Sequence, residues 1–276
     1  MSIKSRLKKI ILLLLHGEAK PVYANIVCNN PNERLKGRKI IITGGSRGLG
    51  EAMARKFKSE GASVLITGRI EASIAETAKS IGCKYLVLDM LKPQSFDEFI
   101  NSADELLGGV DTLVNNAGIS LHENTFFDVT PVSFDTQINT NFRGPLFLTQ
   151  SFIRRIKANG KKGNVLFISS ETGDTTDCRP YGYTKAAINS MVKGLANLFQ
   201  KESIRINAVA PGITATEMTG INVEGNINAG SYATGRFYIP QEIAEVATFL
   251  ISDESGCVSG QIITCNNAQT VNPRWK

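Results

Sequence analysis

The strongest constraint on the fold of this chain is a regular alternation of short apolar runs with segments of helical length, which starts at Lys39. Continuous apolar strands separated by helices are typical of a parallel sheet that is buried on both faces and joined by right-handed crossovers. The sequence therefore predicts an α/β fold with a doubly wound parallel sheet of seven strands. The expected strands are Ile40–Thr43, Val64–Thr67, Tyr85–Leu88, Thr112–Asn115, Val165–Ser169, Ile204–Val209 and Ile262–Thr264.

The length of 276 residues and the hydrophobic content of 42% fit a single domain with a substantial core. We expect this domain to span residues 37–276, behind an N-terminal extension of residues 1–36. The net charge of +6 is concentrated at the start of the chain, because residues 1–39 hold nine Lys or Arg and two Glu, a balance of +7. The rest holds 22 basic and 23 acidic residues, a balance of −1. A nearly neutral body predicts no nucleic-acid partner.

The extension combines basic side chains with apolar residues at helical spacing between Ser2 and Leu15. Its apolar run, Ile10–Leu15, has six residues, whereas a transmembrane helix needs roughly 20. A secretory signal peptide remains an alternative, although the apolar stretch is too short for one. We favour an amphipathic arm, residues 2–15, that packs on a neighbouring subunit or makes peripheral membrane contact. The protein itself is expected to be cytoplasmic. The segment Cys28–Gly37 is expected to be a linker.

The five cysteines are widely separated, odd in number and not arranged as a C-x-x-C pair. They also lack nearby histidines. This pattern favours reduced thiols over disulfides, and no metal site is expected.

A glycine-rich segment, Thr43-Gly44-Gly45-Ser46-Arg47-Gly48-Leu49-Gly50, connects the first expected strand to a helix. Glycines in such a turn let the backbone approach a pyrophosphate, which then lies at the positive N-terminus of the helix. An ordinary strand-to-helix loop has a similar composition, so this segment alone is weak evidence for a nucleotide.

A second group of chemical residues follows the fifth expected strand. Ser170 comes directly after that strand, and Tyr181 and Lys185 lie four residues apart on one face of the next helix. A free phenol has a pKa of about 10, so Tyr181 needs a neighbouring cation such as Lys185 to exchange protons near neutral pH. Tyr/Lys pairs at this spacing are common on helix surfaces, so the pair gains its meaning from its neighbours.

Five motifs in this order resemble the short-chain dehydrogenase/reductase family, in its compact branch of 3-oxoacyl-[acyl-carrier-protein] reductases and related carbonyl reductases. They are the TGxxxGxG turn, Asp89, the Asn115–Gly118 segment, the Ser170/Tyr181/Lys185 set and Pro211-Gly212 followed by Thr216. The resemblance covers roughly residues 37–268 and implies a Rossmann-type sheet. It also implies an NADP(H)-dependent or NAD(H)-dependent oxidoreductase that interconverts a ketone and a secondary alcohol.

By this resemblance, Tyr181 is the general acid, Lys185 its cation, Ser170 a donor to the substrate oxygen, and Asn141 a holder of water in the proton relay. Ser169 and Asn139 are the nearest alternatives to Ser170 and Asn141. The expected cofactor-binding residues are Thr43, Gly44, Ser46, Arg47, Gly48, Leu49, Gly50, Arg69, Asp89, Met90, Asn116, Ala117, Gly118, Tyr181, Lys185, Pro211, Gly212, Thr214 and Thr216.

The choice of cofactor depends on the end of the second strand, where a carboxylate would bind the ribose hydroxyls of NAD. This chain has Gly68-Arg69 there, and Arg69 and Arg47 could bind a 2′-phosphate. We therefore predict NADP(H). The alternative is that Glu71 binds the ribose.

Three segments depart from the family pattern or lie outside its motifs. Asn266-Asn267-Ala268 stands where Asp-Gly-Gly is usual, and Glu171 occupies a position that is often small or apolar. Glu171 makes a polar or hydroxylated substrate more plausible. The Gly-rich segment Thr219–Phe237 is expected to form a lid over the pocket.

The predicted substrate is a small carbonyl or alcohol compound, such as a 3-oxoacyl thioester, a sugar-like ketone or a polycyclic alcohol. The alternative function is a catalytically silent NADP-binding sensor or structural subunit. A homo-oligomer, either a tetramer or a dimer, is implied by the resemblance.

Overall fold

The computed structural model describes residues 32–271 except 223, 226, 230, 231 and 233. The predicted amphipathic arm, residues 2–15, lies outside the described residues. Within the described part, Leu35 is fully buried, and its backbone N–H donates a hydrogen bond of 2.9 Å to the Glu60 carbonyl. The chain therefore already packs on the body at this point, while the domain boundary at residue 37 stays a prediction.

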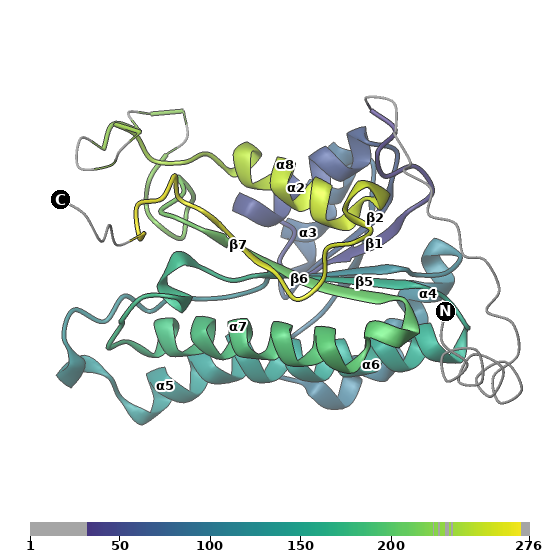
Figure 1. Ribbon diagram of the computed structural model, residues 1–276, viewed down its shortest axis with the longest axis horizontal. Helices are drawn as coiled ribbons and strands as arrows, with labels where there is room; N and C mark the ends of the chain where they lie inside the picture. Colours follow the sequence, from purple (N-terminus) through teal and green to yellow (C-terminus); the bar gives the residue numbers. More distant parts are fainter. Residues whose placement is uncertain (1–31, 223, 226, 230–231, 233, 272–276) are drawn as a thin grey trace, which may run out of the picture.

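The seven predicted strands form one parallel sheet with the order β3-β2-β1-β4-β5-β6-β7 (Figure 1). Because the chain runs outward from β1 to β3 and then returns to place β4 beside β1, the strand order reverses between β1 and β4. The predicted α/β class and strand number are confirmed, with the strand ends within two residues of expectation. The strands are β1 (Lys39–Ile42), β2 (Ser63–Gly68), β3 (Lys84–Val87), β4 (Thr112–Asn115), β5 (Gly163–Ile168), β6 (Ile204–Pro211) and β7 (Ile262–Cys265).

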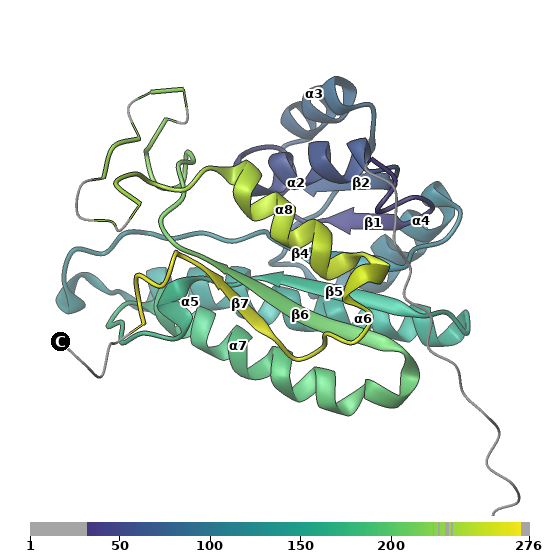
Figure 2. The same cartoon turned by 45° about the horizontal axis from the view of Figure 1, so that its top comes forward.

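Helices cover both faces of the sheet, as Figures 1 and 2 show. On one face lie α2 (Gly48–Ser59), α3 (Glu71–Ile81) and α8 (Pro240–Ile251), and on the other lie α4 (Phe96–Leu107), α5 (Pro131–Ile138), α6 (Gly144–Ala158) and α7 (Pro180–Leu198). Short turns complete the order, namely η1 (Pro93–Ser95), η2 (Phe126–Asp128), the π-helical η3 (Asn139–Arg143), η4 (Glu171–Gly173), η5 (Gln200–Glu202) and η6 (Asp253–Ser255). None of the described helices is both long and apolar enough to cross a membrane.

Alternate side chains of the central strands enter two separate cores, because successive residues of a strand point to opposite faces. Ile41 packs with residues of α4, α6 and α7, whereas its neighbours Ile40 and Ile42 pack with residues of α2 and α8. Val165 and Leu166 divide between the two cores in the same way. Since both faces are buried, polar chemistry is left to the ends of the strands.

Candidate active site

A pocket of about 690 Å³ lies at the carboxyl ends of the central strands. Its lining includes Gly44 after β1, Asn116 after β4, Ser170 after β5 and Pro211 at the end of β6. The pocket therefore lies at the reversal of strand order, where open α/β sheets bind their ligands.

The glycine turn requires glycine at particular positions. Gly44 and Gly48 have φ values of +64° and +56°, in the left-handed region that other residues rarely adopt. A Cβ on Gly50 would lie 2.1 Å from the Gly44 carbonyl oxygen and 2.6 Å from Nδ2 of Asn116. Helix α2 begins at Gly48 without a side-chain cap, and its first residues line the pocket. Its first N–H groups are thus suited to bind a phosphate.

Thr43 and Asn116 tie the ends of β1 and β4 together. The fully buried Thr43 hydroxyl accepts hydrogen bonds from the backbone N–H groups of Asn116 and Ala117, each 3.0 Å long. The Asn116 side-chain amide donates to the carbonyls of Thr43 and Gly44, both at 2.9 Å. Thr43 therefore supports the cofactor edge from behind, whereas Asn116, Ala117 and Gly118 line the pocket.

Two arginines line the pocket beside the glycine turn. Arg47 and Arg69 are exposed, and neither forms an ion pair with any described residue. Glu71, the alternative ribose ligand, begins α3 and is absent from the described pocket lining. Asp89, whose Oδ1 accepts a 3.0 Å hydrogen bond from the Leu91 N–H, does line the pocket. The geometry favours a site that accepts added negative charge near the arginines.

The structure brings Ser170, Tyr181 and Lys185 to this same pocket. Lys185 is 6% exposed, its Nζ donates a 2.8 Å hydrogen bond to the Ile168 carbonyl, and it lies 5.3 Å from the centre of the Tyr181 ring. A buried ammonium is therefore held beside the phenol by the end of β5.

Burial dominates the proton affinities of this pair. It lowers the pKa of Lys185 to about 8. It also raises the pKa of Tyr181, an effect that the hydrogen bond with Ser170 and the charge of Arg179 only partly oppose. From the sequence, the positive charge of Lys185 is expected to lower the pKa of the phenol. In the structure the loss of solvent around the phenolate outweighs its stabilisation by neighbouring groups, so Tyr181 keeps its proton at neutral pH.

Ser169 and Ser170 have different surroundings. The Ser169 hydroxyl donates a 2.6 Å hydrogen bond to Oδ1 of Asn189 in α7, so it is already engaged. The Ser170 hydroxyl accepts from the Thr172 N–H at 3.2 Å and interacts with the Tyr181 phenol. Ser170 is therefore the better placed of the two to reach a substrate.

Asn141 lies behind the pocket rather than on its surface. It is 3% exposed within η3, where its Oδ1 accepts from the Ile119 N–H and its Nδ2 donates to the Ile119 carbonyl, both at 2.8 Å. Nδ2 also lies 3.3 Å from the Thr184 hydroxyl oxygen. Its side chain thus fixes the segment after β4 against α7. The alternative residue, Asn139, begins the same π-helical turn.

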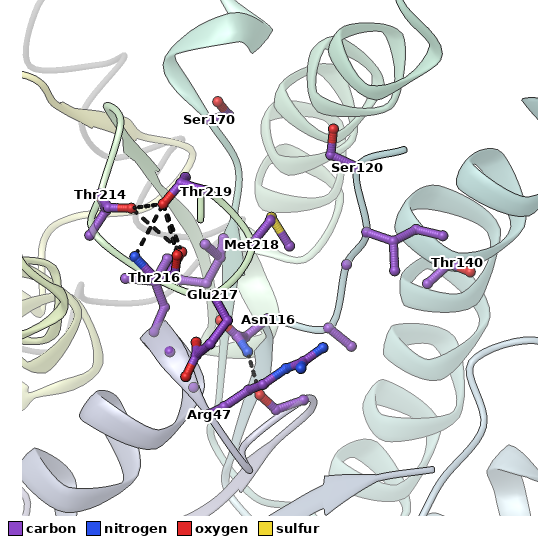
Figure 3. Close-up of a pocket in the computed structure, with 18 of the residues that line it drawn as sticks. Arg47, Asn116, Ser120, Thr140, Ser170, Thr214, Thr216, Glu217, Met218 and Thr219 are labelled. Atoms are coloured by element: carbon purple, nitrogen blue, oxygen red, sulfur yellow. Dashed lines mark hydrogen bonds between the residues drawn. The ribbon is translucent and has the colours of Figure 1, made fainter. Parts of the chain in front are cut away.

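The loop after β6 carries a hydroxyl network that the sequence analysis did not predict. Gly212, Thr214 and Thr216 line the pocket as expected. The Thr219 hydroxyl connects the two threonines, because its oxygen lies 2.8 Å from the Thr214 carbonyl and 2.9 Å from the Thr216 carbonyl and its single proton can be shared between them (Figure 3). The spacing of the threonines was the available signal, but hydroxyls in a loop have too many alternative partners to predict this pairing.

Glu217 and Met218 also line the pocket and were missed. Glu217 lies at the glycine-turn end of the pocket, with Oε2 3.4 Å from the position of a Cβ on Gly48, whereas Ser170 lies at the other end in the view of Figure 3. The Met218 carbonyl lies 2.9 Å from Nε2 of His122, which joins the loop after β4 to the loop after β6. Residues of the predicted lid, including Ile221 and Phe237, line the pocket. Its mobility stays a prediction.

The unusual C-terminal segment contacts Glu171, a residue that lines the pocket. Asn266 is 1% exposed, and its Nδ2 donates 2.8 Å hydrogen bonds to Oε2 of Glu171 and to the Thr270 hydroxyl. Asn267 and Ala268 have φ values of +49° and +62°. These two residues thus keep the left-handed backbone that the usual glycines adopt without strain.

The chain belongs to the short-chain dehydrogenase/reductase family, and its oxidoreductase class follows from that membership. The family model described as enoyl-(acyl carrier protein) reductase matches residues 44–267. The chain is 31% identical over 243 residues to the 3-oxoacyl-[acyl-carrier-protein] reductase FabG of Aquifex aeolicus, covering 84% of this chain and 97% of that protein.

Two further similarities concern the cofactor. The NADP-dependent (R)-specific alcohol dehydrogenase of Lentilactobacillus kefiri is 33% identical, with 83% of this chain and 94% of that protein covered. A short-chain dehydrogenase from Burkholderia cenocepacia in complex with NADP superposes with a TM-score of 0.75 at 26% identity. That match covers 84% of this chain and 98% of the solved chain.

Proposed function

We propose that this protein is an NADP(H)-dependent oxidoreductase that interconverts a ketone and a secondary alcohol. The observation that carries the proposal is that one pocket is lined both by the glycine turn and by Ser170, Tyr181 and Lys185. The substrate is a 3-oxoacyl thioester or another polar carbonyl compound. An NADP-dependent alcohol dehydrogenase and an NADP complex among the similar proteins support the cofactor assignment.

The glycine turn and the two arginines fit NADP(H). The N-terminus of α2 would hold the pyrophosphate, since its first N–H groups have no side-chain cap. Arg47 and Arg69 would hold the 2′-phosphate, because guanidinium groups donate paired hydrogen bonds to phosphate oxygens. The loop from Pro211 to Thr216 would hold the nicotinamide end. When bound, the nicotinamide supplies or accepts the hydride.

Residues of the chain then stabilise and neutralise the negative charge that develops on the substrate oxygen. Tyr181 keeps its proton at neutral pH and donates it to that oxygen in the direction of reduction. Ser170 donates a hydrogen bond to the same oxygen as negative charge grows there. Lys185, with one N–H on the Ile168 carbonyl, keeps two more donors and a positive charge beside the phenol. We assign Asn141 to the proton relay behind it.

The test follows NADPH and NADH consumption in parallel against a panel of carbonyl compounds. Tyr181→Phe should lower turnover by about 10²–10⁴-fold, since it removes the acid, while NADPH binding is kept. Tyr183→Phe is the matched control, because Tyr183 is 43% exposed on the same helix. NADPH binding without any turnover by the wild type would instead favour the silent sensor.

We further propose a cytoplasmic homo-oligomer, a tetramer or a dimer, built on α6 and α7. Exposed apolar side chains on these helices support this, including Phe147 at 37% and Leu198 at 64% exposure. Charged substitutions, Phe147→Glu and Leu198→Glu, should lower the mass measured by light scattering. An unchanged mass would exclude this surface as the interface. Deleting residues 2–30 would test the predicted arm by the same measurement and by liposome binding.

A further inference from the structure

Three consecutive side chains give the substrate end of the pocket a polar wall. Ser170, Glu171 and Thr172 all line the pocket, at the start of η4. The Thr172 hydroxyl oxygen is buried and has no hydrogen-bond partner among the described residues. Buried polar atoms are rarely left unpaired, so this wall is suited to a ligand that carries hydroxyl groups.

Asn266 holds Glu171 in this wall from the other end of the chain. The two residues are 95 positions apart, and the Asn266 amide donates its two N–H groups to Oε2 of Glu171 and to the Thr270 hydroxyl. Oε1 of Glu171 receives no hydrogen bond from the described part of the chain, and thus remains an acceptor. The pKa of Tyr232, a residue of the lid segment, is raised first by burial and then by the Glu171 carboxylate.

The two positions depart from the family pattern together. By the resemblance to the family, a small or apolar residue is expected at position 171 and an Asp at position 266. An Asp at 266 would set a second carboxylate about 3 Å from Glu171, and like charges at this distance repel strongly. The neutral amide of Asn266 removes that repulsion and supplies a donor. The Glu at position 171 therefore accounts for the Asn at position 266.

We propose that Glu171, positioned by Asn266, determines specificity by accepting a hydrogen bond from a substrate hydroxyl next to the reacting carbonyl. Among the polar carbonyl compounds of the proposed function, this favours a neutral hydroxyketone, or the corresponding vicinal diol in oxidation, over a 3-oxoacyl thioester, which has no hydroxyl next to its keto group. A carboxylate in the wall also disfavours anionic substrates, since both charges would lose solvent without pairing. This inference rests on the proposed reductase function.

The first test compares two ketones that differ by one hydroxyl, 1-hydroxybutan-2-one and butan-2-one, with NADPH as the reductant. The readout is the ratio of kcat/KM for the hydroxylated ketone to that for the plain ketone. The wild type should have a ratio well above one. Glu171→Leu should lower this ratio at least tenfold, because it removes the acceptor at nearly constant volume.

The second test separates the positioning role of Asn266 from a structural role. Asn266→Asp should lower the same ratio, whereas Asn267→Asp, the same change at the exposed neighbouring residue, should not. The double variant Glu171→Gln with Asn266→Asp should recover it. The Gln amide can then donate to the new carboxylate and keep its carbonyl oxygen for the substrate.

The outcomes are distinct. If the enzyme turns over butan-2-one but Glu171→Leu changes the ratio of kcat/KM values by less than twofold, the inference is overturned. The reductase function would then remain intact. If the double variant and Asn266→Asp are both folded by circular dichroism and the ratio of kcat/KM values stays low in the double variant, the role of Asn266 is overturned. Absence of turnover with every carbonyl tested would remove the proposed function and this inference with it.

Discussion

The two ends of the pocket are built in different ways. At the cofactor end, strand ends, a glycine turn and a helix N-terminus provide the contacts, and each hydrogen bond of Thr43 and Asn116 there has a backbone group as one partner. At the substrate end, η4, the loop after β6 and the C-terminal segment meet through side chains, as in the Glu171–Asn266 contact. Contacts of the first kind are fixed by the fold, whereas those of the second can change without altering the sheet. The oxidoreductase class is shared with the family, and we propose that the side-chain contacts at the substrate end set the specificity of this chain.

The largest effect is expected from breaking the backbone packing of the cofactor end. Gly50→Ala would force a Cβ to within 2.1 Å of the Gly44 carbonyl, so the turn must move. We expect a loss of about 1–3 kcal/mol in the free energy of unfolding, measured in urea, and at least tenfold weaker NADPH binding.

Gly194→Ala is the matched control, because an added Cβ there meets no atom within 4 Å in the exposed part of α7. It should raise stability by about 0.5–1 kcal/mol. Equal behaviour of the two variants would show that the close approach at Gly50 is unimportant.

Arg69 tests whether the cofactor end recognises the 2′-phosphate. Arg69→Ala should weaken NADPH binding by about 10–100-fold, the value of hydrogen bonds to a charged group, and weaken NADH binding much less. Titration of protein fluorescence with each nucleotide measures both. Glu71→Ala is the control, and a larger loss of NADH binding in that variant would restore the alternative in which Glu71 binds the ribose.

Lys185 lies where the two ends meet, and its burial predicts a pH effect on stability. Burial lowers its pKa from 10.5 to about 8 in the folded state, so the unfolded chain binds more protons between these values. The stability of the wild type should therefore rise with pH from about 8 to 9.5, relative to Lys185→Met, by on the order of 1 kcal/mol.

Urea unfolding of both proteins at pH 7.5, 8.5 and 9.5 measures this difference. The raised pKa of Tyr181 acts in the opposite direction, but only above pH 10, its ordinary value. If the stabilities of the two proteins changed in parallel with pH, the lowered pKa of Lys185 in the folded state would be contradicted.

The smallest effect concerns backbone strain near the substrate end. Ala268 has a φ of +62°, which costs a residue with a Cβ about 1–2 kcal/mol, and glycine avoids this cost but orders at a larger entropic loss. Ala268→Gly should thus raise the free energy of unfolding by about 0.5–1 kcal/mol. A lower melting temperature for this variant would mean that the alanine side chain contributes packing that outweighs the strain.

The sequence was most informative where one short motif specifies both a backbone shape and a chemical role. The strands, the turn from Thr43 to Gly50 and the Tyr181/Lys185 spacing were all readable, because each depends on residues near one another in the chain. The pKa of Tyr181 was not, since desolvation depends on everything that surrounds the phenol. The roles of Thr219 and Asn266 also escaped, because their partners are chosen by the folded loops.

By itself, then, the sequence determined the doubly wound parallel sheet and the family to which the chain belongs. The sheet follows from the alternation of apolar runs with segments of helical length, and the family from five motifs that occur in the family order. Only the tertiary structure decided that Glu171 contacts Asn266, that His122 contacts Met218, and that the Ser169 hydroxyl is engaged by Asn189 while Ser170 interacts with the Tyr181 phenol. The physical reason is that hydrogen bonds between distant segments depend on positions that the whole packed chain fixes.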